Sequence, residues 1–86
     1  MTTNKNDSPL YVLEKEVILK GRRIPNQELS IKYIDKKIAM KRFQNEIMNI
    51  LENIESNQAK YERVGIYLKE YTESGGNKIV NFFIRF

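Results

Sequence analysis

The side chains most often used in catalysis are sparse in this chain of 86 residues. It has no histidine and no cysteine, which removes the commonest general base, the commonest metal ligand and all thiol chemistry. Two acidic pairs remain, Glu14 with Glu16 and Glu70 with Glu73. Paired carboxylates perform acid–base chemistry only in a cleft that separates their pKa values, and so small a domain offers little cleft. We therefore expect Glu14 and Glu16 to be cross-strand partners of basic residues.

The segment Ser74-Gly75-Gly76 could form an anion-binding nest, but no Gly-x-x-x-x-Gly-Lys pattern surrounds it. A hairpin turn is the simpler interpretation, because glycine adopts the positive φ angles that such turns need. Scattered acidic residues alone define no metal site. The sequence therefore predicts a protein that is not an enzyme and that uses no cofactor, no metal and no small-molecule substrate.

A better candidate for chemistry is a set of aromatic and basic residues in the last third of the chain. They occur at alternate positions of two apolar segments: Tyr67, Lys69, Tyr71, Ile79, Phe83 and Arg85. On an antiparallel sheet, aromatic rings flanked by cations can stack unpaired bases. Such rings can also anchor a protein interface, or simply fill cross-strand pairs. The chain lacks the glycine-aromatic strand signature of RNA-recognition modules.

The formal net charge of +4 is spread along the chain, and two local clusters of basic residues stand out. One cluster surrounds Gly21, and the other follows Asp35; their members are Lys20, Arg22 and Arg23, and Lys36, Lys37, Lys41 and Arg42. Cations in the first turns of a helix oppose its dipole, so the second cluster can be interpreted as a phosphate-facing helix start, aided by the first cluster. The alternative is ordinary solvated surface charge.

Hydrophobic periodicity predicts the elements that position these residues. Residues 10–19 and 29–34 alternate as two strands of a hairpin that turns through Gly21 and Pro25, although Lys15 interrupts the apolar face. Asp35 is a good N-cap, and the apolar period then changes to 3.6 over residues 35–57. The predicted buried stripe of this helix comprises Met40, Phe43, Ile47, Ile50, Leu51 and Ile54, and the opposite side carries Arg42, Asn45, Glu46, Asn49 and Asn53. Two more strands, residues 64–71 and 79–86, flank the turn at residues 73–77.

The order ββαββ predicts a two-layer α+β domain, with a four-stranded, mainly antiparallel sheet and one long helix packed on one face. This single domain would span residues 10–86, after a mobile tail at residues 1–9. The apolar residues expected under the helix are Leu13, Val17, Leu19, Leu29, Ile31, Tyr33, Val64, Ile66, Leu68, Val80, Phe82 and Ile84. The uncovered sheet face would then carry the aromatic and basic residues, whereas a solvated face is normally polar.

Two functions fit this surface. The first is a small basic, non-catalytic module that binds nucleic acid or a nucleoprotein complex, with stacking by Tyr67, Tyr71 and Phe83 and phosphate contacts from Lys69, Arg85 and the two basic clusters. The second is a protein-interaction module that is either a homodimer or an accessory protein of a phage or mobile element that inhibits a host defence enzyme. Lys, Asn and Ile make up 30 of the 86 residues, a bias that A/T-rich coding would produce.

The N-terminal segment lacks the apolar stretch of a signal peptide, and no apolar run is long enough to span a membrane. The sequence therefore predicts a cytoplasmic protein without membrane contact. Its partner would be nucleic acid or a protein that handles nucleic acid.

Overall fold

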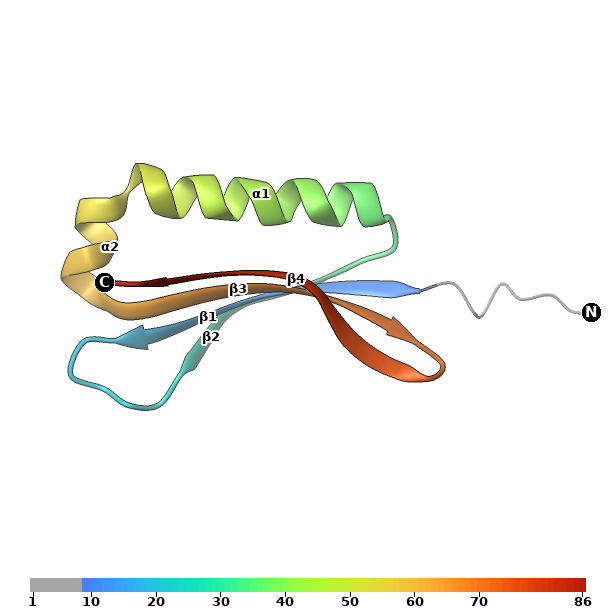
Figure 1. Ribbon diagram of the computed structural model, residues 1–86, viewed down its shortest axis with the longest axis horizontal. Helices are drawn as coiled ribbons and strands as arrows, with labels where there is room; N and C mark the ends of the chain where they lie inside the picture. Colours follow the sequence, from blue (N-terminus) through green and yellow to red (C-terminus); the bar gives the residue numbers. More distant parts are fainter. Residues whose placement is uncertain (1–8) are drawn as a thin grey trace, which may run out of the picture.

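The computed structural model describes residues 9–86. Along the chain it contains strands β1 (Leu10–Leu19) and β2 (Asn26–Tyr33), helices α1 (Lys36–Glu52) and α2 (Ile54–Lys60), and strands β3 (Tyr61–Thr72) and β4 (Gly75–Arg85) (Figure 1). The two-layer α+β fold is confirmed, with the short helix α2 as an addition. The tail expected at residues 1–9 lies outside the described residues, apart from Pro9.

The strands form one antiparallel sheet in the order β2-β1-β3-β4, so each hairpin supplies one central strand and one edge strand. Both hairpin turns contain a glycine with positive φ, Gly21 at 80° and Gly75 at 123°. The register of the β1–β2 pairing shifts between Lys15 and Glu16, and that of the β3–β4 pairing shifts between Leu68 and Lys69. Bulges of this kind bend and twist strands. Figure 1 shows both hairpin ends bending away from α1.

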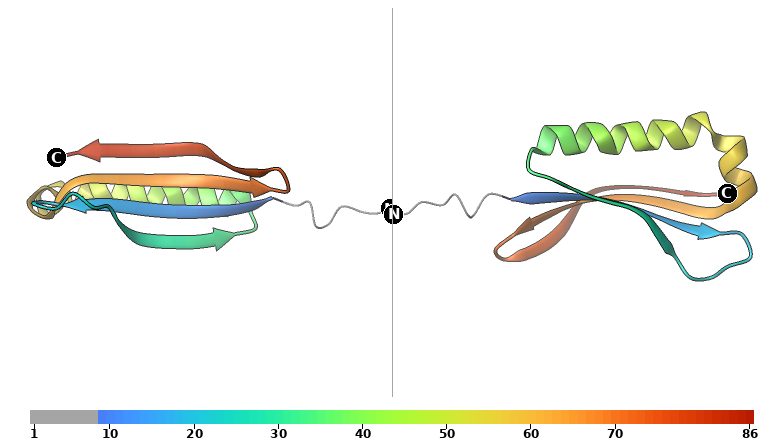
Figure 2. Two further views of the ribbon diagram at one scale, coloured as in Figure 1. Left: turned by 90° about the horizontal axis from the view of Figure 1, so that it is seen from below. Right: turned by 180° about the vertical axis from the view of Figure 1, so that it is seen from behind.

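The core lies between α1 and one face of the sheet. Helix α1 crosses above the central strands β1 and β3, and β4 lies to one side of it (Figure 2). Beneath the helix, Leu13, Val64, Ile66 and Leu68 have no exposed surface. All the strand residues expected under the helix belong to this core or pack against it, except Ile31. Tyr11, Ala39 and Tyr61 are also in the core, although the hydrophobic pattern did not predict their burial.

Side-chain hydrogen bonds cap both ends of helix α1. Asp35 Oδ1 accepts a hydrogen bond from the backbone N–H of Lys37 at 2.8 Å, which confirms the N-cap. At the other end the helix breaks at Asn53, where φ is −117°, rather than continuing to Asn57. The side chain of Asn57 then donates to the carbonyl oxygen of Ile50 at 3.0 Å, so one of the free carbonyls of the last turn is satisfied.

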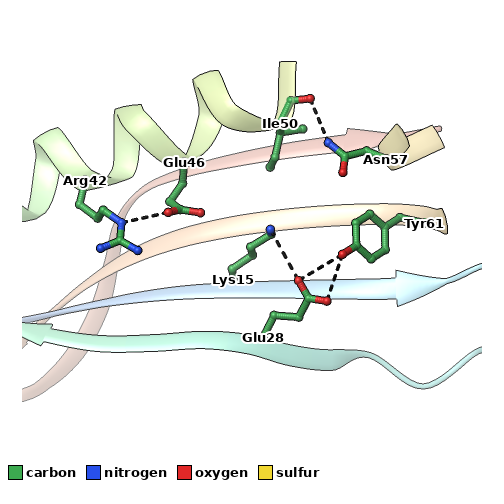
Figure 3. Close-up of polar contacts among 7 residues, drawn as sticks. All are labelled: Lys15, Glu28, Arg42, Glu46, Ile50, Asn57 and Tyr61. Atoms are coloured by element: carbon green, nitrogen blue, oxygen red, sulfur yellow. Dashed lines mark hydrogen bonds and ion pairs between the residues drawn. The ribbon is translucent and has the colours of Figure 1, made fainter. Parts of the chain in front are cut away.

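The buried stripe of α1 differs from the predicted one. Its buried residues are Ala39, Phe43 and Ile50, whereas Leu51 is 49% exposed and Ile54, beyond the break, is 37% exposed. The predicted burial of Leu51 and Ile54 was therefore wrong. The stripe is rotated toward Arg42 and Glu46, which were predicted on the outer side but form a half-buried ion pair at 2.9 Å that points toward the sheet (Figure 3).

A separate polar cluster, formed by residues of β1, β2 and β3, lies on the helix side of the sheet. Tyr61, only 6% exposed, donates its hydroxyl to Glu28 Oε2 at 3.1 Å, and Lys15 Nζ lies 3.6 Å from Glu28 Oε1 (Figure 3). Burial of the ring, together with the negative Glu28 carboxylate, raises the pKa of Tyr61. Lys15 thus interrupts the apolar face without leaving an unpaired charge in the core.

Candidate functional site

The sheet face opposite α1 has no covering layer among residues 9–86 (Figures 1 and 2). We call it the open sheet face. Three cross-strand rows of β1, β3 and β4 define it: Ile18–Arg63–Arg85, Glu16–Gly65–Phe83 and Glu14–Tyr67–Asn81. A fourth row, Lys32–Val12–Lys69–Lys78, reaches β2. Tyr67, Lys69, Phe83 and Arg85 therefore face away from the helix, as their alternation predicts.

Tyr67 lies flat on the open sheet face because Gly65 has no side chain. A Cβ atom at Gly65 would come within 2.5 Å of Tyr67 Oη and 2.9 Å of Cζ, so the tyrosine ring occupies the space above the glycine. On its other side the ring meets the ammonium group of Lys78, whose Nζ is 4.3 Å from the ring centroid. Tyr67 is therefore held between the backbone of β3 and a cation.

Phe83 is the most exposed ring of the open sheet face, with 47% of its surface accessible. It stands opposite Gly65 on the neighbouring strand, so the position directly across from it carries no side chain. The guanidinium carbon of Arg63 lies 5.1 Å from its ring centroid. A flat group that stacked on Phe83 would therefore also meet a positive charge.

Two like-charged pairs border these rings. Arg63 lies opposite Arg85, and Lys69 lies opposite Lys78, both across the β3–β4 pairing. Like charges directly opposite one another destabilise a sheet. Lys69 is compensated by Glu14, whose Oε1 lies 2.8 Å from Nζ. None of the ion pairs among residues 9–86 involves Arg63, Arg85 or Lys78.

The acids of the open sheet face are confined to β1. Glu14 accepts from Lys69 across the β1–β3 pairing, so its predicted role as a cross-strand partner is confirmed. The hydrogen bond and negative charge of Glu14 raise the pKa of Lys69. Lys69 was predicted to contact phosphate, but in the structure its charge is already paired. The unpaired positive charge therefore lies toward β4, next to Phe83.

Tyr71 and Ile79 lie near the β3–β4 turn, away from the other rings. Tyr71 is 37% exposed and its ring lies close above Gly76, its cross-strand neighbour. Ile79 falls at the register shift of the β3–β4 pairing, where strict alternation is lost. The structure thus places Tyr67 and Phe83 side by side and leaves Tyr71 and Ile79 at one end.

The two basic clusters do not lie together. Lys20, Arg22 and Arg23 occupy the β1–β2 turn, at the end of the molecule next to α2, whereas α1 begins at the opposite end (Figure 1). The turn bends away from α1, toward the side of the open sheet face. Arg22 and Arg23 line a shallow cavity of about 250 Å³, together with Leu19, Ile24 and Asn26. The expectation that this turn aids the helix start does not fit the structure.

At the start of α1, Lys36, Lys37 and Lys41 are exposed, but they belong to the helical layer rather than to the open sheet face. Arg42 is held by Glu46, and this ion pair raises the pKa of the arginine. Arg42 was expected to contact phosphate with the three lysines. The structure instead engages it in the contact between helix and sheet.

Two further kinds of feature concern metal binding and membrane spanning. Residues 9–86 contain no cluster of three or more acidic, histidine or cysteine side chains that could hold a metal ion. No helix among them is long and apolar enough to cross a membrane. No family model matches the chain, and neither does any curated protein or solved structure.

Proposed function

We propose that the protein is a small, basic, non-catalytic module that binds single-stranded nucleic acid on the open sheet face. The observation that carries the proposal is the Arg63–Arg85 pair, in which two cations oppose each other beside an exposed Phe83 with no acid partner among residues 9–86. A phosphate group between the arginines would remove their repulsion. We also propose that the protein acts in the cytoplasm.

The charge of the open sheet face supports the same ligand. Its rows carry cations at Lys32, Arg63, Lys69, Lys78 and Arg85, against acids at only Glu14 and Glu16. The basic β1–β2 turn lies at one end of the same side of the molecule. An anionic strand would therefore be attracted to this side over several nucleotides, since phosphate contacts dominate affinity for nucleic acids.

The rings supply the second part of single-strand recognition. Phe83 offers a nearly half-exposed face, and Tyr67 lies beside it with its ring parallel to the sheet surface over Gly65. A base that stacked on Tyr67 would displace the Lys78 ammonium from the ring, and that ammonium would then be free to contact a phosphate. Stacking of this kind tolerates any base, so we expect little sequence preference.

The test is fluorescence anisotropy of a labelled oligothymidine, compared with a duplex of the same length, at several salt concentrations. We expect binding that weakens as salt rises, and a loss of about 5- to 150-fold for Phe83→Ala, which corresponds to one stacked base. The double variant Lys78→Ala with Arg85→Ala removes two phosphate contacts. The association constant of this variant should depend less steeply on salt, so that the slope of its logarithm against log salt concentration becomes less negative by about 1.4.

The matched control removes two lysines from the other layer, with Lys36→Ala and Lys37→Ala. Because these side chains lie at the start of α1, we expect the salt slope to stay unchanged. If the control loses as much salt dependence as the Lys78→Ala, Arg85→Ala variant, the nucleic acid contacts the start of α1 instead of the open sheet face. Absence of any anisotropy change at low salt, with single strand and with duplex, would exclude nucleic acid as the ligand.

A protein-interaction module is the second candidate, and the exposure of Phe83 and of the apolar strand β4 favours it. In that case Phe83 would anchor an interface and the cations would steer an acidic partner toward it. Inhibition of a host enzyme by such an accessory protein belongs to this candidate. It becomes the better proposal if the oligonucleotides fail to bind.

A further inference from the structure

The free edge of β4 can form backbone hydrogen bonds. The sheet order leaves β4 paired with β3 alone. The backbone N–H of Phe86 donates to the carbonyl oxygen of Glu62 at 3.0 Å, so the even-numbered residues of this part of β4 direct their backbone groups toward β3. Because backbone groups alternate along a strand, Asn81, Phe83 and Arg85 direct theirs toward the free edge.

The two edges of the sheet differ in how they are protected. At β2 the strand follows Pro25, carries Glu28 and Lys32, and is irregular where it faces Lys15 and Glu16. Proline, charges and bulges all discourage an edge strand from pairing with another chain. From residue 80 to residue 86, β4 and the residue after it have the sequence VNFFIRF, with one charge and no proline. The β4 edge therefore lacks the protection that β2 has.

The apolar residues of β4 on the helix side are also incompletely covered. Val80, Phe82, Ile84 and Phe86 pack against the core but are only partly buried, because α1 lies over β1 and β3 (Figure 2). On the other side Phe83 is nearly half exposed. A neighbour that extended the sheet beyond β4 would cover apolar surface on both faces at once.

We propose that two copies of this chain form a symmetric dimer by antiparallel pairing of their β4 strands, with the two-fold axis at Phe83. Two copies of one strand that pair antiparallel are related by such an axis. Since the outward groups belong to odd-numbered residues, odd-numbered residues must pair with odd-numbered residues, so the axis lies at a residue rather than between two. An axis at Phe82 or Ile84 would pair only two of the three outward residues of each copy, and would form about four backbone hydrogen bonds. At Arg85 it would bring two arginines together, and at Asn81 the pairing would run into the register shift at Ile79.

With the two-fold axis at Phe83, the side chains of the two β4 strands complement each other on both faces of the extended sheet. On the open sheet face, Phe83 meets Phe83 of the second copy, and Asn81 meets Arg85, so no like charges oppose each other. On the helix side, Phe82 meets Ile84 and Val80 meets Phe86, which pairs apolar with apolar side chains. About six backbone hydrogen bonds would form, from three pairs of outward residues. The open sheet faces of both copies would then join into one continuous surface.

A single strand pairing buries less surface than the roughly 800 Å² per partner of stable complexes, so we expect weak association. Sedimentation velocity at protein concentrations from roughly 1 μM to roughly 1 mM measures a dimer of this affinity. We expect a reversible dimer within this range. Asn81→Asp should tighten it by about 2- to 30-fold, because two Asp–Arg pairs would form by symmetry. Asn81→Lys should loosen it, and the double change Asn81→Lys with Arg85→Glu should restore it.

Amide hydrogen exchange reads the register directly and does not depend on the nucleic-acid proposal. The backbone amides of Asn81, Phe83 and Arg85 should exchange fast in dilute solution and become protected as the dimer forms. A dimer through the open sheet face would leave these amides unprotected and would overturn the proposal. A single-chain mass at every concentration would overturn it as well, even if oligonucleotides bind. A thermal melt of each variant verifies that these exposed substitutions leave the fold intact.

Discussion

Arg63 and Arg85 lie directly opposite one another on β3 and β4, and neither forms an ion pair among residues 9–86. Arg63 instead lies over the ring of Phe83. A sheet selected for stability alone would place an acid at one of the two positions, since opposed unlike charges stabilise a pair of strands. The arrangement suits a surface that must remain positive for a ligand.

Arg85→Glu should therefore change stability and binding in opposite directions. In dilute protein, urea denaturation should show the free energy of unfolding rising by about 0.5–1 kcal/mol, because a repulsive pair becomes an attractive one. Oligothymidine affinity should fall in the same variant. Arg85→Gln removes the repulsion without adding an attraction, so its gain in stability should be smaller. A less stable Arg85→Glu protein would contradict this account of the pair.

Ile50 and Leu51 provide a test of where the buried stripe of α1 lies. Ile50 is 2% exposed and Leu51 is 49% exposed, although the hydrophobic pattern of the sequence assigns both to the core. Ile50→Ala should cost about 2–5 kcal/mol in the free energy of unfolding, since it leaves a cavity. Leu51→Ala should cost less than about 1 kcal/mol, because little buried surface is lost. Equal costs in urea denaturation would mean that the helix is rotated from the position described here.

Gly65→Ala should lift the ring of Tyr67 from the sheet, because the new Cβ would come within 2.5 Å of Tyr67 Oη. The ring would then leave Lys78, and the ring-current shifts of the Lys78 side-chain protons should disappear from the NMR spectrum. We expect a loss of about 1 kcal/mol in the free energy of unfolding. In a Tyr67→Ala background, Gly65→Ala should lower the free energy of unfolding by less. An equal loss in both backgrounds would show that the clash with the Tyr67 ring is not the cause of the destabilisation.

The pKa of Tyr61 lies above its ordinary value of 10.0, because the ring is buried and the hydroxyl faces Glu28. Since the folded protein holds this proton more tightly than the unfolded chain, the stabilisation is complete below pH 10 and is lost as pH rises through the folded pKa. Glu28→Gln should lower the pKa of Tyr61 toward 10.0, as measured by phenolate absorbance in an alkaline titration.

Glu70→Gln is the matched control for that titration. The pKa of Tyr11 is also raised, by burial of its hydroxyl and by its hydrogen bond to Glu70 at 3.0 Å. The control should shift Tyr11 and leave Tyr61 unchanged, while Glu28→Gln should do the reverse. If the same tyrosine transition moves in both variants, the two pairs are not independent as the structure describes them.

Strand alternation predicted most of the open sheet face. The side of Tyr67, Lys69, Phe83 and Arg85 follows from a period of two residues, which a strand keeps whatever its neighbours are. The pattern could not reveal Arg63 or Lys78 as partners of the rings, because these contacts depend on register between strands. The register shift at Ile79 was equally hidden, since nothing in its local sequence marks a bulge.

Periodicity was less informative for the helix. Apolar residues surround more than half of α1, so the pattern did not distinguish the buried Ala39 from the exposed Leu51. In the structure the helix is rotated so that the Arg42–Glu46 ion pair points toward the sheet, and this rotation leaves Leu51 outside the buried stripe (Figure 3). The two basic clusters were grouped by composition, and the chain path placed them at opposite ends of the molecule (Figure 1).

By itself, the sequence determined the order of the elements, the cap at Asp35, the glycine turns and the sides of the central strands, because these depend on local conformational preference and side-chain period. The rotation of α1, the opposition of Arg63 and Arg85, and the unprotected edge at β4 became evident from the assembled fold. These features arise where segments distant in the chain meet, and strand order and register are properties of the assembled sheet rather than of any one segment.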